Sequence, residues 1–262
     1  MTVELASRAF GPDDPGLPLT SILHGLLGQG RNWQAIAKRL AHGRRVLAVD
    51  LRNHGHSPHD PLMTYEAMAG DLAALIVKSG GRASVIGHSM GGKVAMMLAL
   101  TAPERVDRLV VIDVAPVTYK HREFAHYLSA MAKIDPAGFS RRADIEVALA
   151  EVDPDPRIRA FLASNIEGAP GAMRWLPDLS ALQAGLDDIL GFTPPAGASF
   201  TEPCLFLVGG KSAYVQEQQR AVILDLFPKA TIKTIADAGH WVHADKPAEV
   251  LEALEGILPS AN

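Results

Sequence analysis

The sequence has little cysteine and no excess of basic residues. Its 262 residues include one cysteine, Cys204, which excludes an intrachain disulfide and a zinc site built from several thiolates. Such cysteine usage fits a reducing compartment, so we expect a cytoplasmic location. The 25 Lys and Arg residues are outnumbered by 29 Asp and Glu, giving a formal net charge of −4. Nucleic acid is therefore not expected as a partner.

Long hydrophobic runs are also missing. The most apolar stretch, residues 84–100, is interrupted by His88, Lys93 and three glycines, so we expect no membrane span and no membrane partner. The first ten residues carry Glu4 and Arg8 without an apolar segment, which argues against a secretory signal. Hydrophobic residues make up 48% of the chain and charged residues 21%, as in an ordinary globular protein with one large core.

Apolar runs alternate with helical patterns in the first part of the chain. Continuous apolar runs of this kind are typical of strands in a parallel sheet that helices cover on both faces. The pattern predicts strands over residues 19–23, 45–50, 83–87 and 108–113, and helices over residues 65–78 and 92–100. These elements indicate a doubly wound α/β unit.

The alternation stops after residue 115 and resumes near residue 196. Three helices without intervening strands are expected in between, over residues 121–128, 145–151 and 157–164. Strands then follow at 204–208 and 231–235, and helices at 216–226 and 247–258. We therefore predict one α/β core domain, residues 1–115 and 196–262, with a helical insertion over residues 116–195.

Residues 87–91 (GHSMG) match G-x-S-x-G between a predicted buried strand and a predicted helix. Glycines two positions before and after Ser89 allow a sharp turn that presents the serine at the carboxyl edge of the sheet. This setting predicts Ser89 as a nucleophile. The alternative interpretation is a Gly-rich turn that only connects strand and helix.

A serine needs a base to accept its proton. His240 follows the last predicted strand in a loop that reaches the same edge, and nucleophile-before-histidine is the chain order of this type of site. His243, three residues later, is the competing candidate.

The orienting acid is less direct to assign. Proteins with this elbow commonly carry it after the strand that here ends at Val208, yet residues 209–214 contain no Asp or Glu. Asp113 ends the preceding strand of the core and could reach the imidazole, fixing its tautomer. The alternatives are Asp178, Asp187 and Asp188, near the end of the insertion.

Backbone N–H groups and the insertion complete the predicted site. The N–H groups of Leu26, after the strand at 19–23, and of Met90 form a candidate oxyanion hole. Phe124, Tyr127 and Trp175 in the insertion are candidate substrate contacts, although such apolar residues more often pack within the insertion itself.

Four motifs together resemble the α/β-hydrolase superfamily over nearly the whole chain. They are residues 24–28 (HGLLG), 50–57 (DLRNHGHS), 87–93 (GHSMGGK) and 238–243 (AGHWVH). In the second, Asn53 stands where the superfamily has a glycine. The second and third motifs and residues 113–116 (DVAP) resemble small bacterial carboxylesterases of the YbfF type. The resemblance implies an α/β-hydrolase fold with a helical cap, and an acid that maps onto Asp113.

A serine at the elbow suits attack on an acyl carbonyl. We expect hydrolysis of short-to-medium acyl esters or thioesters through a Ser-His-Asp triad and an acyl-enzyme. No cofactor or metal is expected. The expected partner is the small-molecule substrate, and the expected state is a monomer or homodimer. An acyltransferase or carbon–carbon bond hydrolase with the same triad stays open, as does a binding protein without turnover.

Overall fold

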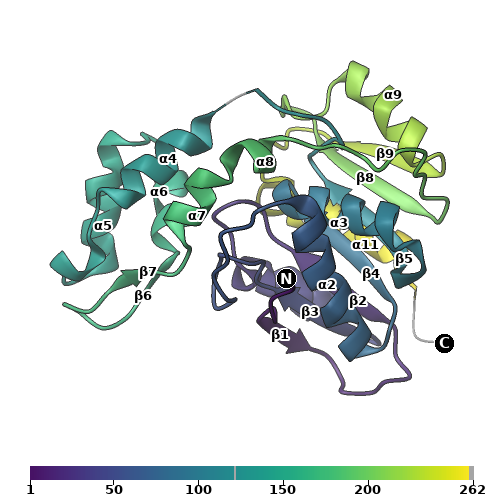
Figure 1. Ribbon diagram of the computed structural model, residues 1–262, viewed down its shortest axis with the longest axis horizontal. Coiled ribbons are helices and arrows are strands. Elements are labelled where there is room, and N and C mark those ends of the chain that lie inside the picture. Colours follow the sequence, from purple (N-terminus) through teal and green to yellow (C-terminus); the bar gives the residue numbers. More distant parts are fainter. Residues whose placement is uncertain (121, 260–262) are drawn as a thin grey trace.

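A seven-stranded sheet forms the centre of the protein, in the computed structural model that describes residues 1–120 and 122–259 (Figure 1). The strand order is β1-β3-β2-β4-β5-β8-β9, and every neighbouring pair is parallel except β1 with β3. The strands are β1 (Ser7–Phe10), β2 (Leu19–Leu23), β3 (Arg45–Val49), β4 (Ala83–His88), β5 (Val106–Ile112), β8 (Cys204–Gly209) and β9 (Ala230–Ile235).

Helices cover both faces of this sheet. Alternate strand residues enter two different apolar clusters, as Val85 and Ile86 do, because successive side chains of a strand point to opposite faces. Helices α2 (Tyr65–Ser79), α3 (Met90–Thr101) and α9 (Glu217–Leu226) pack in the first cluster, and α1 (Gln34–Leu40), α10 (Val242–Asp245) and α11 (Pro247–Ile257) in the second. The 3-10 helices are η1 (Gly30–Trp33), η2 (Pro103–Arg105), η3 (Pro136–Gly138) and η4 (Leu149–Glu151). The doubly wound sheet predicted from the sequence is confirmed.

A helical cap lies beside one end of the core, between β5 and β8 in the chain (Figure 1). Its helices are α4 (Glu123–Ala132), α5 (Arg142–Ala148), α6 (Pro156–Ala163), α7 (Leu179–Ala184) and α8 (Leu186–Leu190). All lie within the predicted insertion, whose limits stay predictions. Residue 121, where the first cap helix was expected to begin, lies outside the described residues.

Among the described residues, no strand lies between the three helices predicted in the cap, which correspond to α4, α5 and α6, but a short pair of strands that was not predicted follows α6. β6 (Ile166–Glu167) pairs antiparallel with β7 (Arg174–Trp175). Two-residue strands are too short to show the alternation by which a sequence reveals a strand.

Buried polar contacts join the cap to the core. Tyr65 Oη donates a hydrogen bond to the Ile189 carbonyl (2.6 Å). Lys93 Nζ donates to the carbonyls of Leu190 (2.8 Å) and Gly191 (2.7 Å), and burial lowers the pKa of this lysine to about 7. These contacts hold the end of α8 and the residue after it against α2 and α3.

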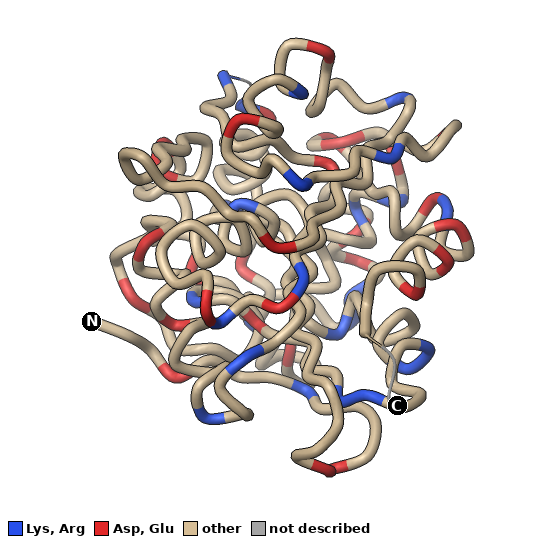
Figure 2. The backbone as a smooth tube through the Cα atoms, turned by 90° about the vertical axis from the view of Figure 1, so that its right-hand side faces the viewer, with Lys and Arg blue, Asp and Glu red and all other residues tan. Residues whose placement is uncertain are grey.

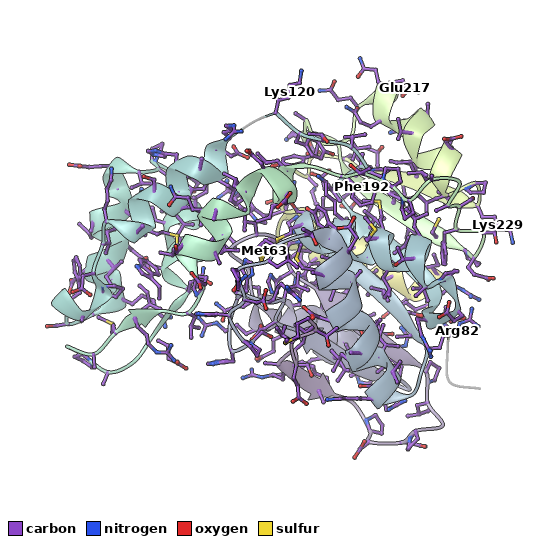
Figure 3. All side chains as sticks on the ribbon, viewed as in Figure 1. Met63, Arg82, Lys120, Phe192, Glu217 and Lys229 are labelled. Atoms are coloured by element: carbon purple, nitrogen blue, oxygen red, sulfur yellow. The ribbon has the colours of Figure 1, made fainter. Side chains whose placement is uncertain are left out.

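Apolar side chains fill the same junction. Met63 and Phe192 both lie where the cap meets the core (Figure 3). A Cβ atom added at Gly185, between α7 and α8, would lie 2.5 Å from Met63 Cβ, so the absence of a side chain there permits the close approach.

The strand register brings the ends of β4, β5 and β8 level. His88 pairs with Ile112, and Ile112 pairs with Leu207. The next residues continue the pattern, because Ser89 N donates to the Ile112 carbonyl (3.0 Å) and Asp113 N to the Leu207 carbonyl (2.8 Å). Ser89 and Asp113 therefore leave neighbouring strands at the same edge of the sheet.

Acidic and basic residues are interspersed along the chain in Figure 2 rather than gathered by sign. Among the helices of the described residues, none has the length and apolar character needed to cross a membrane.

Candidate active site

Ser89 occupies a strained turn between β4 and α3. Its φ of 52° and ψ of −119° lie in a region that side-chain-bearing residues rarely adopt. The neighbouring glycines make this turn possible, because a Cβ atom at Gly87 would lie 2.2 Å from the Gly91 carbonyl oxygen, and one at Gly91 would lie 2.5 Å from that of His24. The serine is 9% exposed, at the floor of a pocket.

His240 lies in the loop between β9 and α10, and three contacts fix its ring and backbone. Its Nδ1 donates a hydrogen bond to Asp113 Oδ2 (2.8 Å). The Tyr214 ring stacks on the imidazole with 3.9 Å between centroids, and His88 Nε2 donates to the His240 carbonyl (2.9 Å). With Nδ1 bound to Asp113, Nε2 is the nitrogen left to accept a proton, and Ser89 and His240 line the same pocket.

His243 has different surroundings. Its ring stacks on Trp33 with 4.1 Å between centroids, and its Nδ1 has no hydrogen-bonding partner among the described residues. Burial and the nearby His240 lower the pKa of His243 to about 3. No described carboxylate orients this imidazole, unlike that of His240.

Asp113 is 1% exposed, and its carboxylate accepts three hydrogen bonds. Oδ1 accepts from the Gly209 N–H (2.9 Å), while Oδ2 accepts from Ser212 Oγ and from His240 Nδ1. The residue has a φ of 53°, a conformation that Asp adopts more readily than most residues.

The alternative acids have other contacts. Asp178 caps α7 by accepting a hydrogen bond from the Ala181 N–H (3.0 Å). Asp187 forms an exposed ion pair with Arg122, and Asp188 is an exposed residue in the first turn of α8. None of these three is hydrogen-bonded to His240 in the described structure.

The loop after β2, which contains Leu26, passes close to Ser89. A Cβ atom at Gly25 would lie 3.0 Å from His88 Nδ1 and 3.3 Å from Ser89 Cβ, so this backbone passes closely over the elbow. Leu26 and Ser89 line the same two pockets, and the Met90 N–H begins α3, where backbone donors lack helical partners. The two predicted oxyanion donors thus belong to residues that line the same pocket as the serine.

Neutral imidazoles support that loop. His24 Nε2 accepts from the Leu51 N–H (3.0 Å), and His54 Nε2 accepts from the Leu27 N–H (3.1 Å). Burial lowers the pKa of His24 to about 4 and that of His54 to about 3. Asn53 has a φ of 63°, which explains how asparagine can replace a glycine in this motif.

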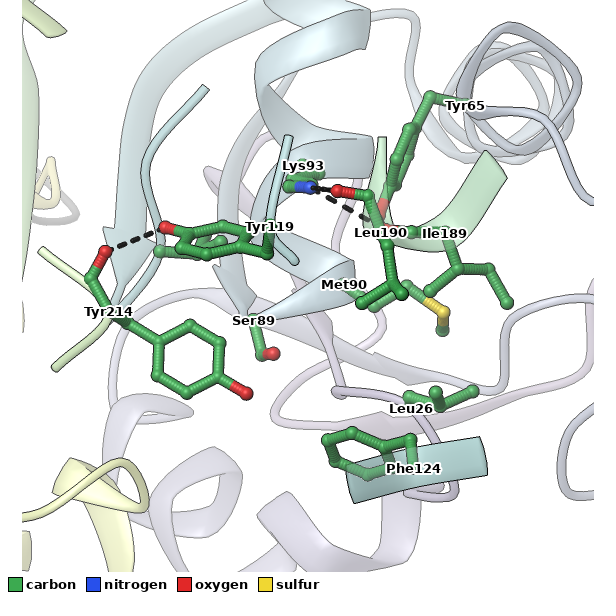
Figure 4. Close-up of a pocket in the computed structure, with 11 residues that line it drawn as sticks. Leu26, Tyr65, Ser89, Met90, Lys93, Tyr119, Phe124, Ile189, Leu190 and Tyr214 are labelled. Atoms are coloured by element: carbon green, nitrogen blue, oxygen red, sulfur yellow. Dashed lines mark hydrogen bonds between the residues drawn. The ribbon is translucent and has the colours of Figure 1, made fainter. Parts of the chain in front are cut away.

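Two pockets meet at Ser89, and both are lined by Leu26 and Phe124 as well. We call the first, which includes Lys93, the Tyr119 pocket (Figure 4). The second is the Trp241 pocket, and His240 is among the residues that line it.

Of the three cap residues predicted to contact substrate, Phe124 lines both pockets. Tyr127 and Trp175 line neither. Tyr127 Oη donates to Asp153 Oδ2 (2.6 Å), and Trp175 Nε1 donates to the Ile134 carbonyl (3.0 Å), so both are bound within the cap. Their contact with substrate stays a prediction.

Within the described residues, no group of three or more His, Cys, Asp or Glu side chains is arranged to hold a metal ion. Cys204 is buried, and burial raises the pKa of its thiol to about 12, which leaves it a poor metal ligand and a poor nucleophile.

Comparison with known proteins identifies the family to which this chain belongs. The profile of the alpha/beta hydrolase family matches residues 22–253. The chain belongs to the alpha/beta hydrolase family.

Individual members resemble this alpha/beta hydrolase over most of its length. It is 41% identical over 261 residues to sn-1-specific diacylglycerol lipase ABHD11 of Danio rerio, covering 96% of this chain and 81% of that protein. It is 38% identical over 242 residues to Esterase YbfF of Escherichia coli (strain K12), covering 90% and 91%. A solved structure described as a marine microorganism esterase matches with a TM-score of 0.92 at 35% identity, covering 98% and 100%.

These matches confirm the predicted fold class, the resemblance to YbfF-type esterases and the prediction of a hydrolase enzyme. Two residues of this hydrolase's site were not predicted from the sequence. Ser212 lies in the loop at residues 209–214 and Trp241 in the motif at residues 238–243, but the sequence predicted no role for either. A hydroxyl or an indole beside a motif gives no signal until the loops that carry it are placed in space.

Proposed function

We propose that this alpha/beta hydrolase is a carboxylic ester hydrolase that forms an acyl-enzyme on Ser89, with His240 as the base and Asp113 as the residue that orients it. One observation carries the proposal: the imidazole bound to Asp113 through Nδ1 (2.8 Å) shares a pocket with a serine on a strained elbow. The esterase and lipase names of its relatives support the same reaction class.

The reaction follows from these positions. Ser89 Oγ attacks the acyl carbon as its proton passes to His240 Nε2, and the Leu26 and Met90 N–H groups stabilise the oxyanion. The bond to the leaving oxygen then breaks as His240 returns the proton to that oxygen. Water attacks the acyl carbon of the acyl-enzyme by the same route, and the carboxylic acid leaves with Ser89 restored.

The proposed substrates are short-to-medium acyl esters or thioesters. Phe124, Leu26 and Val114 give the space around Ser89 an apolar wall, and apolar walls favour acyl chains over charged groups. The cap also lines this space through Ile189 and Leu190 of α8, which Tyr65 of α2 and Lys93 of α3 hold in place.

Hydrolysis of p-nitrophenyl butyrate tests the proposal. We expect Ser89→Ala to lower kcat by about 10⁴-fold or more with an unchanged circular dichroism spectrum. Ser180→Ala, at an exposed serine of α7, is the matched control and should keep the wild-type rate. No hydrolysis of chromogenic esters by the wild type would instead indicate a binding protein, and full activity of Ser89→Ala would exclude this nucleophile.

A further inference from the structure

The two pockets beside Ser89 differ in their relation to the base. His240 lines the Trp241 pocket and is not among the described residues that line the Tyr119 pocket. Both pockets border Ser89, so either is in place to receive the acyl chain or the leaving group of an ester.

The path of the proton decides which pocket receives the leaving group. The base that receives the serine proton must return it to the leaving oxygen, which therefore lies within hydrogen-bonding reach of His240. The rest of the leaving group extends from that oxygen into the space beside His240. The acyl chain then occupies the other pocket, next to Met90 and Tyr119.

Aromatic groups from both cap and core form the Trp241 pocket. The Phe161 ring of α6 lies tilted by 55° beside the Trp241 ring, with 5.8 Å between centroids. Trp33, stacked on His243, lines the same space. Flat apolar side chains of this kind bind the face of a planar ligand well.

The pocket has no charged side chain to pair with a charged ligand. No Lys, Arg, Asp or Glu is among the described residues that line it, and burial keeps the pKa of His88 and of His243 well below the usual value, so both imidazoles are neutral. Its one side-chain amide belongs to Asn32, whose Oδ1 accepts from the Gln29 N–H (2.8 Å). The Asn32 Nδ2 group is in no hydrogen bond with the described residues and offers a donor to a neutral oxygen.

We propose that the Trp241 pocket is the leaving-group subsite and that it selects neutral alcohols with an aromatic face, such as benzyl alcohol. This inference rests on the proposed ester hydrolysis and adds the class of alcohol to it. By microscopic reversibility the same pocket holds an acceptor alcohol that attacks the acyl-enzyme in place of water: its oxygen bonds to the acyl carbon, its proton passes to His240, and Ser89 Oγ leaves with that proton.

Two ester series separate the subsites. Butyrate esters of ethanol, benzyl alcohol and choline vary only the leaving group, and benzyl acetate, butyrate and hexanoate vary only the acyl chain. We expect wild-type kcat/KM for benzyl butyrate to exceed that for ethyl butyrate about tenfold. Trp241→Ala should reduce this ratio to about twofold without altering the acyl-length profile, and Trp241→Phe should keep most of it.

Leu190→Ala is the complementary variant, because Leu190 lines the Tyr119 pocket alone. It should shift the acyl-length profile and leave the benzyl-to-ethyl ratio unchanged. Val147→Ala, at a residue of α5 that is 73% exposed, is the control and should change neither. The reverse pattern, or a preference for butyrylcholine over benzyl butyrate, would overturn the inference.

Interception of the acyl-enzyme gives an independent measurement. With ethyl butyrate as donor and added benzyl alcohol, we expect Trp241→Ala to lower the ratio of benzyl butyrate to butyric acid about tenfold. An unchanged ratio would overturn the subsite while leaving ester hydrolysis by Ser89 intact. Failure of the proposed function is recognised separately, by wild-type protein that hydrolyses no ester or by active Ser89→Ala.

Discussion

Ser212 Oγ donates a hydrogen bond to Asp113 Oδ2, the same oxygen that accepts the His240 Nδ1 hydrogen. The two residues come from different strands: Asp113 follows β5, and Ser212 lies in the loop after β8. The loop that lacks an acid therefore contributes a hydroxyl to the acid on the neighbouring strand. Together with the Gly209 N–H, this contact fixes the plane of the carboxylate.

Removing that hydroxyl should slow turnover without abolishing it. We expect Ser212→Ala to lower kcat about tenfold, since one hydrogen bond of about 1.4 kcal/mol is lost from a carboxylate that keeps its other two donors. KM should stay within about twofold, and Ser212→Thr should recover much of the rate. Steady-state kinetics with p-nitrophenyl butyrate measures this, and an unchanged kcat for Ser212→Ala would show that the contact does not assist His240.

Asp113→Asn should have a much larger effect. An amide cannot hold His240 in the tautomer with Nδ1 protonated and Nε2 free, so we expect kcat to fall by about 10⁴-fold, as in other triads. Asp178→Asn and Asp187→Asn are matched controls, because Asn can still cap α7 and Asp187 forms only an exposed ion pair. Both should keep activity within about twofold. Near-full activity of Asp113→Asn, with loss in either control, would assign the acid elsewhere.

The elements that the sequence predicts well are those with a regular pattern of burial. β2 coincides with the predicted strand at 19–23, and α2 differs from the predicted helix by one residue at its end. β1 and the pair β6 and β7 were not predicted, because strands that are exposed or very short lack a continuous apolar run.

Some residues of the candidate site could likewise be predicted from the sequence, and others could not. Ser89 could be proposed from its motif and His240 from chain order, and Asp113 from its place at a strand end; their catalytic roles stay predictions. The contact of Ser212 with Asp113 joins residues 99 positions apart, and the Trp241 pocket likewise joins loops distant in the sequence, so neither motif nor periodicity encodes them. The oligomeric state and the cytoplasmic location also stay predictions.

Stability should fall in mild acid because of the buried imidazoles. The pKa values of His24, His54, His88 and His243 are all lowered by burial, whereas an unfolded chain protonates histidine near pH 6.5. Below that pH the unfolded state binds more protons, so each such histidine lowers the free energy of unfolding by about 1.4 kcal/mol per pH unit until its folded pKa is reached.

Urea unfolding between pH 5.0 and 7.5 measures this slope. His243→Phe, which keeps a flat ring against Trp33, should reduce the slope by about one proton. His42→Gln, at an exposed histidine of the loop after α1, should leave it unchanged. A wild-type stability that is flat from pH 7.5 to 5.0 would contradict the assignment of neutral buried imidazoles.

Lys93 should be needed to hold the cap in place. Lys93→Met fills a similar volume but removes the donor that binds the carbonyls of Leu190 (Figure 4) and of Gly191. We expect the free energy of unfolding at pH 6, where the lysine is charged, to fall by about 2 kcal/mol. Hydrogen exchange should speed up in α8 more than in α5, and equal stability of the variant would show that the ammonium contributes nothing net.

Covalent labelling tests the triad most directly. Diethyl p-nitrophenyl phosphate transfers its phosphoryl group to a serine that a neighbouring base activates. Mass spectrometry of digested protein should find one adduct, on the peptide that contains Ser89, and labelling should be at least a hundredfold slower in His240→Ala. An adduct on another residue, or equal labelling of His240→Ala, would contradict activation of Ser89 by His240.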